Sequence, residues 1–178
     1  DAAGNERWAW ARLDSMPDIT LTVEHRRHAP VILSFLRLSD WYAAEPVVIQ
    51  QRVTSPTLNL AITNPGEATA RQITVTLRSR KSAGFSQPTI TNELTGETCG
   101  TSRVAGGATH VWRLDAGRLA VEYSTDGGTT WASDYANLIT GPLQVGFLRV
   151  EPGTNPLTIT SQGSPDYDLE IRFYPAWH

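Results

Sequence analysis

The sequence contains little cysteine and almost no lysine. Cys99 is the only cysteine, and Lys81 is the only lysine among the 15 basic residues. A single cysteine can form no disulfide within the chain and cannot build a cysteine-based metal cluster. At 178 residues, however, the chain is long enough to bury a stable hydrophobic core without disulfides or metal sites. We therefore expect a fold that is stabilised by its core.

A basic surface and a long apolar run are also missing. The formal net charge is −3, which gives no sign of the basic surface that nucleic-acid binding requires. No apolar run approaches the ~18 residues of a membrane span, and no basic-then-apolar signal segment is present. We expect neither nucleic-acid binding nor membrane insertion. The chain begins at Asp1 rather than methionine, so we expect it to be processed or to be part of a longer chain.

Short segments in which apolar and polar residues alternate dominate the sequence. A period of two is typical of a half-buried β-strand, because successive side chains leave opposite faces. Turn residues such as Asn64-Pro65-Gly66 separate these segments at short intervals. Short strands with turns between them predict an all-β, antiparallel sandwich or barrel. The alternating segments are residues 19–23, 58–62, 73–78, 110–114, 119–123, 157–160 and 169–173, and residues 47–53 predict a further strand.

Two other segments carry different local signals. Residues 5–13 predict a short N-terminal helix, because Asn5 can cap it and residues 14–17 end it. Residues 96–107 are rich in glycine and predict a loop.

Residues 143–163 predict a β-hairpin. Its arms would be residues 144–150 and 157–160. Between the arms, Pro152 fixes φ and Gly153 tolerates a positive φ, which are the features of a tight turn.

The same stretch carries a family resemblance. Residues 148–163 read LRVEPGTNPLTITSQG and resemble a motif in the C-terminal domain of siphophage distal tail proteins and related tail-tip components. Three other segments are similar to the same family in the same order: FLRLSDWY at 35–42, SPTLNLAIT at 55–63 and PTITNELTGE at 88–97. The first of these resembles the closing strand of the family's ring-forming N-terminal belt domain. The resemblance covers residues 31–178.

The resemblance implies two parts and a structural role. Residues 1–45 would be a partial belt-like segment for oligomerisation, and residues 46–178 a galectin-like or jelly-roll-like β-sandwich. The implied function is that of a structural virion protein in a phage tail tip, without catalysis, metal or cofactor. Its partners would be other copies in a ring, the tail tube, hub and tape-measure proteins, and a host surface glycan where the tip contributes to attachment. Assembly would take place in the bacterial host cytoplasm.

Residues 124–131, STDGGTTW, match the Asp-box pattern S-x-D-x-G-x-T-W. Asp126 can accept hydrogen bonds from backbone N–H groups of the turn, the glycines supply positive φ, and Trp131 can pack beside them. Sialidases carry several such boxes on a propeller, whereas this chain has one box and is too short for a propeller. We interpret the motif as a stabilised turn.

Acidic residues and histidines suggest chemistry only weakly. Asp166, Asp168 and Glu170 would share one strand face, and paired carboxylates can act as acid and base or hold Ca²⁺. A carbohydrate-active hydrolase would draw on this group together with Asp126 and Asp134. We read the three as a solvent-exposed face, because apolar residues fill the opposite one. The histidines of the segment EHRRH, His25 and His28, would point to opposite faces of a strand and predict no metal site.

Aromatic residues provide the remaining candidate sites. Buried aromatic residues dominate interfaces, so those near the chain ends are candidates for subunit contacts: Trp8, Trp10, Trp41, Tyr42 and Trp177. Exposed aromatic residues on a sandwich can also stack on sugar rings while acids and amides bind the hydroxyls. The candidates for carbohydrate binding are Trp112, Trp131, Tyr135 and Asp126. Core packing or a subunit interface is the other role that the aromatic side chains of this set can have. A carbohydrate-binding module is therefore the alternative to the tail-tip protein.

Overall fold

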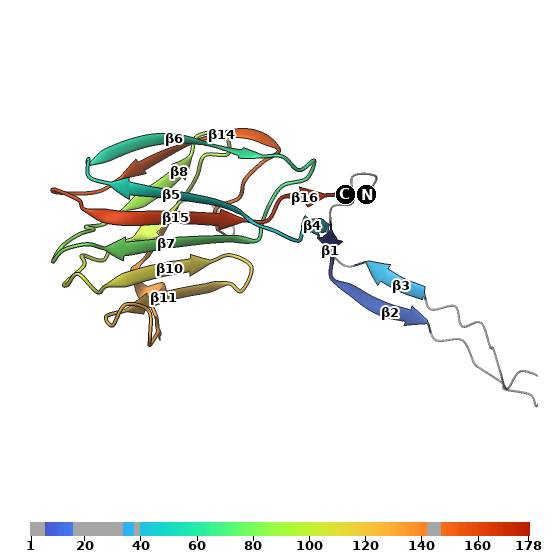
Figure 1. Cartoon of the computed structure of the whole chain (residues 1–178), viewed down its shortest axis with the longest axis horizontal. Coiled ribbons are helices and arrows are strands. Elements are labelled where there is room, and N and C mark those ends of the chain that lie inside the picture. Colours follow the sequence, from blue (N-terminus) through green and yellow to red (C-terminus); the bar gives the residue numbers. More distant parts are fainter. Residues whose placement is uncertain (1–5, 16–33, 38–39, 142–146) are drawn as a thin grey trace, which may run out of the picture.

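The structure is a computed structural model that describes residues 6–15, 34–37, 40–141 and 147–178. Its larger sheet has six strands in the order β12-β11-β10-β7-β15-β5, and every neighbouring pair is antiparallel (Figure 1). The strands are β5 (Val47–Val53), β7 (Ile73–Ser79), β10 (Val111–Asp115), β11 (Ala120–Ser124), β12 (Ala132–Ser133) and β15 (Tyr167–Phe173).

A second sheet has five strands in the order β13-β9-β8-β14-β6, again antiparallel throughout. The strands are β6 (Thr57–Asn64), β8 (Thr89–Asn92), β9 (Glu97–Thr101), β13 (Leu138–Thr140) and β14 (Gly153–Thr160). A short 3₁₀ turn, Tyr135–Asn137, precedes β13.

The two sheets enclose one hydrophobic core. On β15, Leu169, Ile171 and Phe173 are all at most 1% exposed, while the residues between them reach solvent. The other sheet contributes side chains such as Leu157 and Ile159, which are equally buried. Alternating side chains of two antiparallel sheets that meet in this way form a β-sandwich. The predicted all-β, antiparallel sandwich is therefore confirmed.

A smaller sheet lies at one end of the sandwich. It consists of β1 (Arg7–Trp8), β4 (Trp41–Ala43) and β16 (Ala176–Trp177) in the order β1-β4-β16, and we call it the junction sheet. Ala68 N–H donates to the Ala176 carbonyl at 2.9 Å, which connects the junction sheet to the loop after β6. The last described strand, β16, thus lies in the same sheet as the first, β1, with β4 between them.

Two further strands, β2 (Ala11–Ser15) and β3 (Ser34–Arg37), pair only with each other among the described residues. Figure 1 shows this strand pair, which we call the arm, extending from the junction sheet away from the sandwich. The sandwich strands begin at β5, close to the predicted boundary at residue 45, although β16 returns to the junction sheet.

The predicted helix at residues 5–13 is wrong. This stretch forms β1 and the start of β2, with Arg7 and Trp8 opposite Ala43 and Tyr42 of β4. A helix this short is marginal by itself, so pairing with β4 and packing of Trp8 decide the conformation.

The predicted hairpin and the predicted loop also need correction. Residues 142–146 lie outside the described residues, and the only strand pairing of the described part of the first arm is an isolated bridge from Val150 to Ala70. The second arm, within β14, pairs instead with β6 and β8.

Residues 97–101, expected in a loop, form β9, because Cys99 and Thr101 are buried and β8 and β13 flank the strand. The expected strand at residues 19–23 lies outside the described residues.

In the part of the chain that the structure describes, no helix has the length and apolar character needed to cross a membrane.

Candidate functional site

The outer face of the six-stranded sheet is polar. Strand register places Glu122, Arg113, Thr76, Glu170 and Gln50 in one row across β11, β10, β7, β15 and β5. Neighbouring strands lie about 4.8 Å apart, so such a row presents a regular series of polar groups.

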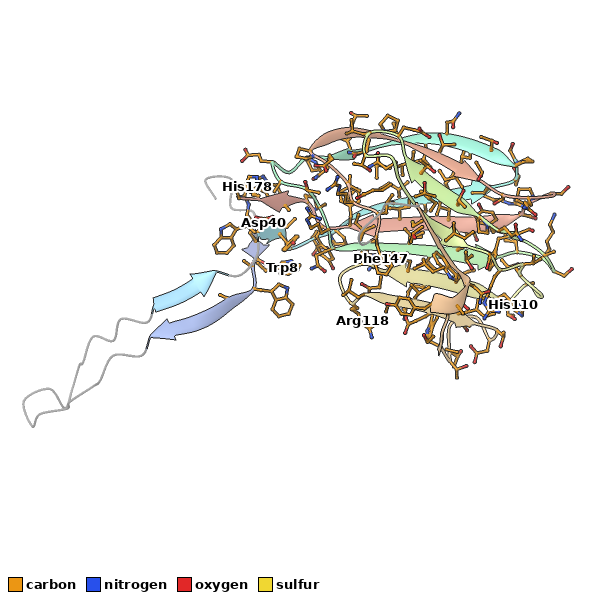
Figure 2. All side chains as sticks on the ribbon, turned by 180° about the vertical axis from the view of Figure 1, so that it is seen from behind. Trp8, Asp40, His110, Arg118, Phe147 and His178 are labelled. Carbon is orange, nitrogen blue, oxygen red and sulfur yellow. The ribbon has the colours of Figure 1, made fainter. Side chains whose placement is uncertain are left out.

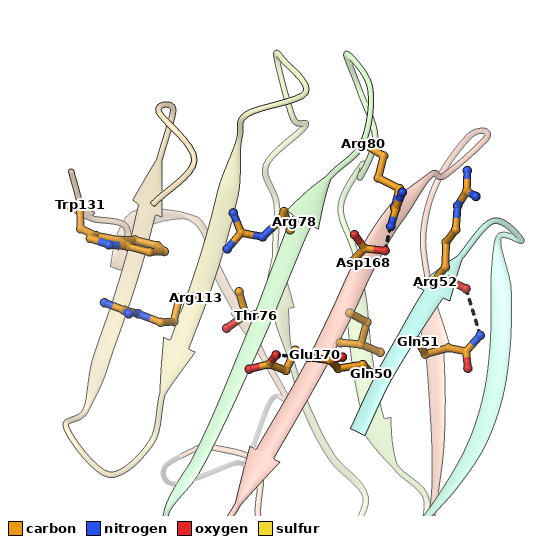
Figure 3. Close-up of a pocket in the computed structure, with 11 residues that line it drawn as sticks. Gln50, Gln51, Arg52, Thr76, Arg78, Arg80, Arg113, Trp131, Asp168 and Glu170 are labelled. Carbon is orange, nitrogen blue, oxygen red and sulfur yellow. Dashed lines mark hydrogen bonds and ion pairs between the residues drawn. The ribbon is translucent and has the colours of Figure 1, made fainter. Parts of the chain in front are cut away.

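A groove of about 460 Å³ lies on this face (Figure 3). Trp131 and Arg113 lie at one side, Arg78 and Thr76 lie in the middle, and Asp168, Glu170 and Gln50 lie at the other side. Ligand sites in proteins occupy about 300–1,000 Å³, so the groove has the size of a small-molecule or oligosaccharide site.

Ion pairs hold most of the charged side chains of the groove. Arg80 Nε lies 2.8 Å from Asp168 Oδ1, and Arg113 Nη2 lies 2.5 Å from Glu122 Oε2. Gln50 Nε2 donates to Glu170 Oε2 at 2.7 Å. Pairs as exposed as these add little stability, but together they fix the positions of the polar groups.

A further pair lies at the rim. Arg52 Nε donates to Asp166 Oδ1 at 2.9 Å, and this hydrogen bond lowers the pKa of the Asp166 carboxyl. The same contact raises the pKa of Arg52. The Asp166 carboxylate is therefore ionised and already paired with the Arg52 guanidinium.

Arg78 is held differently from its neighbours. Its Nη1 donates to the Gly127 carbonyl at 2.9 Å, and no ion pair to it is found among the described residues. This bond ties the turn at residues 124–131 to the edge of the groove.

That turn has the expected construction. Asp126 Oδ1 accepts from Thr129 N–H at 3.0 Å and from Thr130 N–H at 2.9 Å, and its Oδ2 accepts from Thr130 Oγ1 at 2.6 Å. These bonds, the Thr130 hydroxyl first, hold the pKa of Asp126 well below its usual range. Gly127 and Gly128 have φ of 77° and 95°, which a side chain would disfavour.

The turn positions Trp131 at the groove. The guanidinium carbon of Arg113 lies 4.1 Å from the centroid of the Trp131 ring, a cation–π contact. On the turn side, a Cβ on Gly128 would lie 3.1 Å from the indole. The indole is thus fixed between β10 and the turn while remaining partly exposed.

The other candidates for carbohydrate binding lie elsewhere. Trp112 is fully buried in the core, so its role as an exposed stacking residue is wrong; like Leu114 it occupies the inner face of β10. Tyr135 is 47% exposed and donates to the Leu119 carbonyl, but it does not line the groove. Asp126 holds the turn rather than lining the groove.

The acidic candidates are already paired. Asp168 and Glu170 line the groove as expected for one strand face, with Arg80 and Gln50 as partners. Asp134 is 2% exposed and lies 2.6 Å from Arg103 Nη2. Among the described residues no group of His, Cys, Asp and Glu could hold a metal ion, and His25 and His28 lie outside them.

Sequence reasoning missed Gln50, Arg78 and Arg113. Each lies in a segment that was correctly predicted to be a strand, but the groove depends on the strand order β10-β7-β15-β5, which joins segments far apart in the chain. The polar residues of the predicted strands were the signal that could have indicated this outer face, although not the order of the strands across it.

Aromatic residues gather in the junction sheet. The Trp8 indole stacks on the Tyr42 ring with centroids 4.6 Å apart and meets Tyr174 edge-on at 5.6 Å. The Arg7 guanidinium lies 4.1 Å from the Trp177 ring centroid. Figure 2 shows Trp8 at the base of the arm, with Asp40 and His178 nearby.

Of the five candidates for subunit contacts, two are widely exposed. Trp10 is 63% exposed and Trp41 is 42% exposed, whereas Tyr42 is 5% exposed and belongs to the interior of the junction. Trp8 and Trp177 are intermediate.

Comparison of the chain with protein-family models, with curated proteins and with solved structures gives no match.

Proposed function

We propose that this chain is a structural, non-enzymatic subunit of a phage tail tip, which assembles through its arm and junction sheet. The resemblance at residues 35–42, 55–63, 88–97 and 148–163 supports the tail-tip role. In such an assembly, copies of the chain would form a ring in the virion and contact the tail tube, hub and tape-measure proteins.

The observation that carries the proposal is the arm itself. A two-stranded sheet is only marginally stable in water, and β2 and β3 have no third strand among the described residues. An unpaired strand edge is a template for a strand of another molecule. A neighbouring copy would supply that strand and complete the arm.

The exposed tryptophans next to the arm fit the same role. Aromatic residues are enriched in the cores of protein interfaces, where they become desolvated. Trp10 and Trp41, at 63% and 42% exposure, offer such surface beside the arm. Host attachment would belong to the sandwich, which points away from the arm.

Light scattering over a concentration series tests the assembly. We expect a discrete oligomer larger than the 19.5 kDa monomer, and a shift toward monomer in the double variant Trp10→Ala/Trp41→Ala. Tyr135→Ala is the matched control, because Tyr135 is an aromatic residue of similar exposure (47%) on the sandwich. A monomer at every concentration, or equal loss of assembly in the control, would contradict the proposal.

A further inference from the structure

The charges of the groove are nearly balanced. Arg80 pairs with Asp168 and Arg113 with Glu122, while Arg52 at the rim pairs with Asp166. The carboxylates would repel an anionic ligand, and the guanidinium groups would repel a cationic ligand. Arg78 donates to the Gly127 carbonyl and Glu170 accepts from the Gln50 amide, so four arginines stand against four carboxylates in and beside the groove. This balance of charge favours a ligand without net charge.

The polar groups of the groove suit hydroxyl groups. Hydroxyls both donate and accept, whereas guanidinium groups only donate and carboxylates only accept. On this face Asp168 and Glu170 offer acceptors, Arg78 and Arg80 offer donors, and the Gln50 amide offers both. An array of fixed, alternating donors and acceptors is complementary to the neighbouring hydroxyls of a sugar.

Trp131 supplies the apolar part of the site. Its indole is held by Arg113 and the Asp126 turn, so little ordering would be needed on binding. Sugar rings present apolar C–H groups that pack on aromatic surface. We propose that this groove binds a neutral oligosaccharide, with the indole of Trp131 against a sugar ring and with Gln50, Arg78 and Glu170 bound to its hydroxyls.

A binding experiment on the full chain tests the proposal. Hexasaccharides of glucose, mannose, galactose and N-acetylglucosamine are titrated while tryptophan fluorescence and amide chemical shifts are followed. We expect at least one to bind with a Kd below about 1 mM and to shift the amides of β7 and β15. Polygalacturonate and a polyphosphate are the anionic probes, and we expect them to bind at least tenfold more weakly.

Variants locate the binding on the groove. We expect Gln50→Ala to weaken binding about tenfold, since it removes hydrogen bonds to the sugar. Asn59→Ala is the matched control, because Asn59 is an exposed amide on the outer face of the other sheet, bonded to Thr158. Trp131→Ala should abolish binding and Trp131→Phe should restore part of it.

Three results would overturn the inference: no neutral probe binds at about 10 mM, anionic probes bind more tightly, or Gln50→Ala and Asn59→Ala behave alike. Thermal melts of each variant separate loss of binding from loss of folding. The assembly role rests on the arm and the junction sheet, so failure here leaves it intact, and the reverse also holds.

Discussion

The Trp8 indole stacks on the ring of Tyr42, with an angle of 30° between the ring planes, and its Nε1 donates to the Ala43 carbonyl at 2.8 Å. Trp8 belongs to β1 and the other two residues to β4, which lies 35 residues further along the chain. The contact therefore fixes the strand that leads into the arm against the strand that leads into the sandwich. Loss of this one side chain should loosen the base of the arm.

We predict that Trp8→Ala lowers the free energy of unfolding by about 2 kcal/mol, less than the 3–5 kcal/mol of a fully buried tryptophan because Trp8 is partly exposed. Urea denaturation followed by circular dichroism measures the change. Leu94→Ala is the control and should change it by at most about 0.5 kcal/mol, since Leu94 is 56% exposed and lies in a turn of the sandwich, away from the arm. Equal effects of the two substitutions would contradict the role given to Trp8.

The Asp126 turn predicts a dependence of stability on pH. Hydrogen bonds to its carboxylate lower the pKa of Asp126 in the folded chain. The stabilisation is therefore complete above the unfolded pKa of about 4 and is lost as the pH falls through the lower folded pKa. We predict that Asp126→Asn lowers Tm at pH 7, and that the difference from the native chain shrinks between about pH 4 and pH 2.

Thermal melts across that pH range check this prediction. Glu93→Gln serves as the control, because Glu93 is an exposed acid outside the turn. Its difference from the native chain should stay small at all pH values. A constant difference for Asp126→Asn would mean that the turn does not depend on the ionised carboxylate.

The short apolar and alternating segments along the chain were enough to predict most of the sandwich. Residues 47–53 coincide with β5, and the alternating residues of β7 and β15 face the core as expected. Local signals failed where pairing between distant segments decides the structure. Pro152-Gly153 suggested a return onto residues 144–150, but β14 instead has partners on both sides, β6 and β8.

The groove could be predicted only in part, for the same reason. The Asp-box pattern correctly indicated the hydrogen bonds of Asp126 and the packing of Trp131, because all of these contacts lie within eight consecutive residues. Gln50 and Glu170 are 120 residues apart, and nothing in either segment specifies that β5 and β15 are neighbours. Trp112 is a stacking candidate in the sequence only if its strand face is exposed, and its burial beside Leu114 agrees with the alternative of core packing.

The buried position of Trp112 makes a separate prediction. Its side chain fills the core, yet its Nε1 has no hydrogen-bond partner among the described residues. We predict that Trp112→Ala lowers the free energy of unfolding by about 3–5 kcal/mol. Trp112→Phe should lower it by only about 1–2 kcal/mol, because it also removes an unsatisfied buried donor. Denaturant unfolding measures both, and equal effects would contradict this account, because the Phe ring fills much more of the space than the Ala methyl group.

Cys99 gives the last prediction. The thiol is fully buried on β9, and burial, with a smaller effect from Glu97, raises its pKa to about 12. The thiolate is the reactive form, so both access and ionisation oppose reaction in the folded chain. We predict that a disulfide reagent such as DTNB at pH 8 leaves the native chain unmodified and titrates one thiol per chain in guanidinium chloride. Fast reaction of the native chain would mean that β9, held between β8 and β13, opens locally, and the core around Cys99 would then be less stable than its burial indicates.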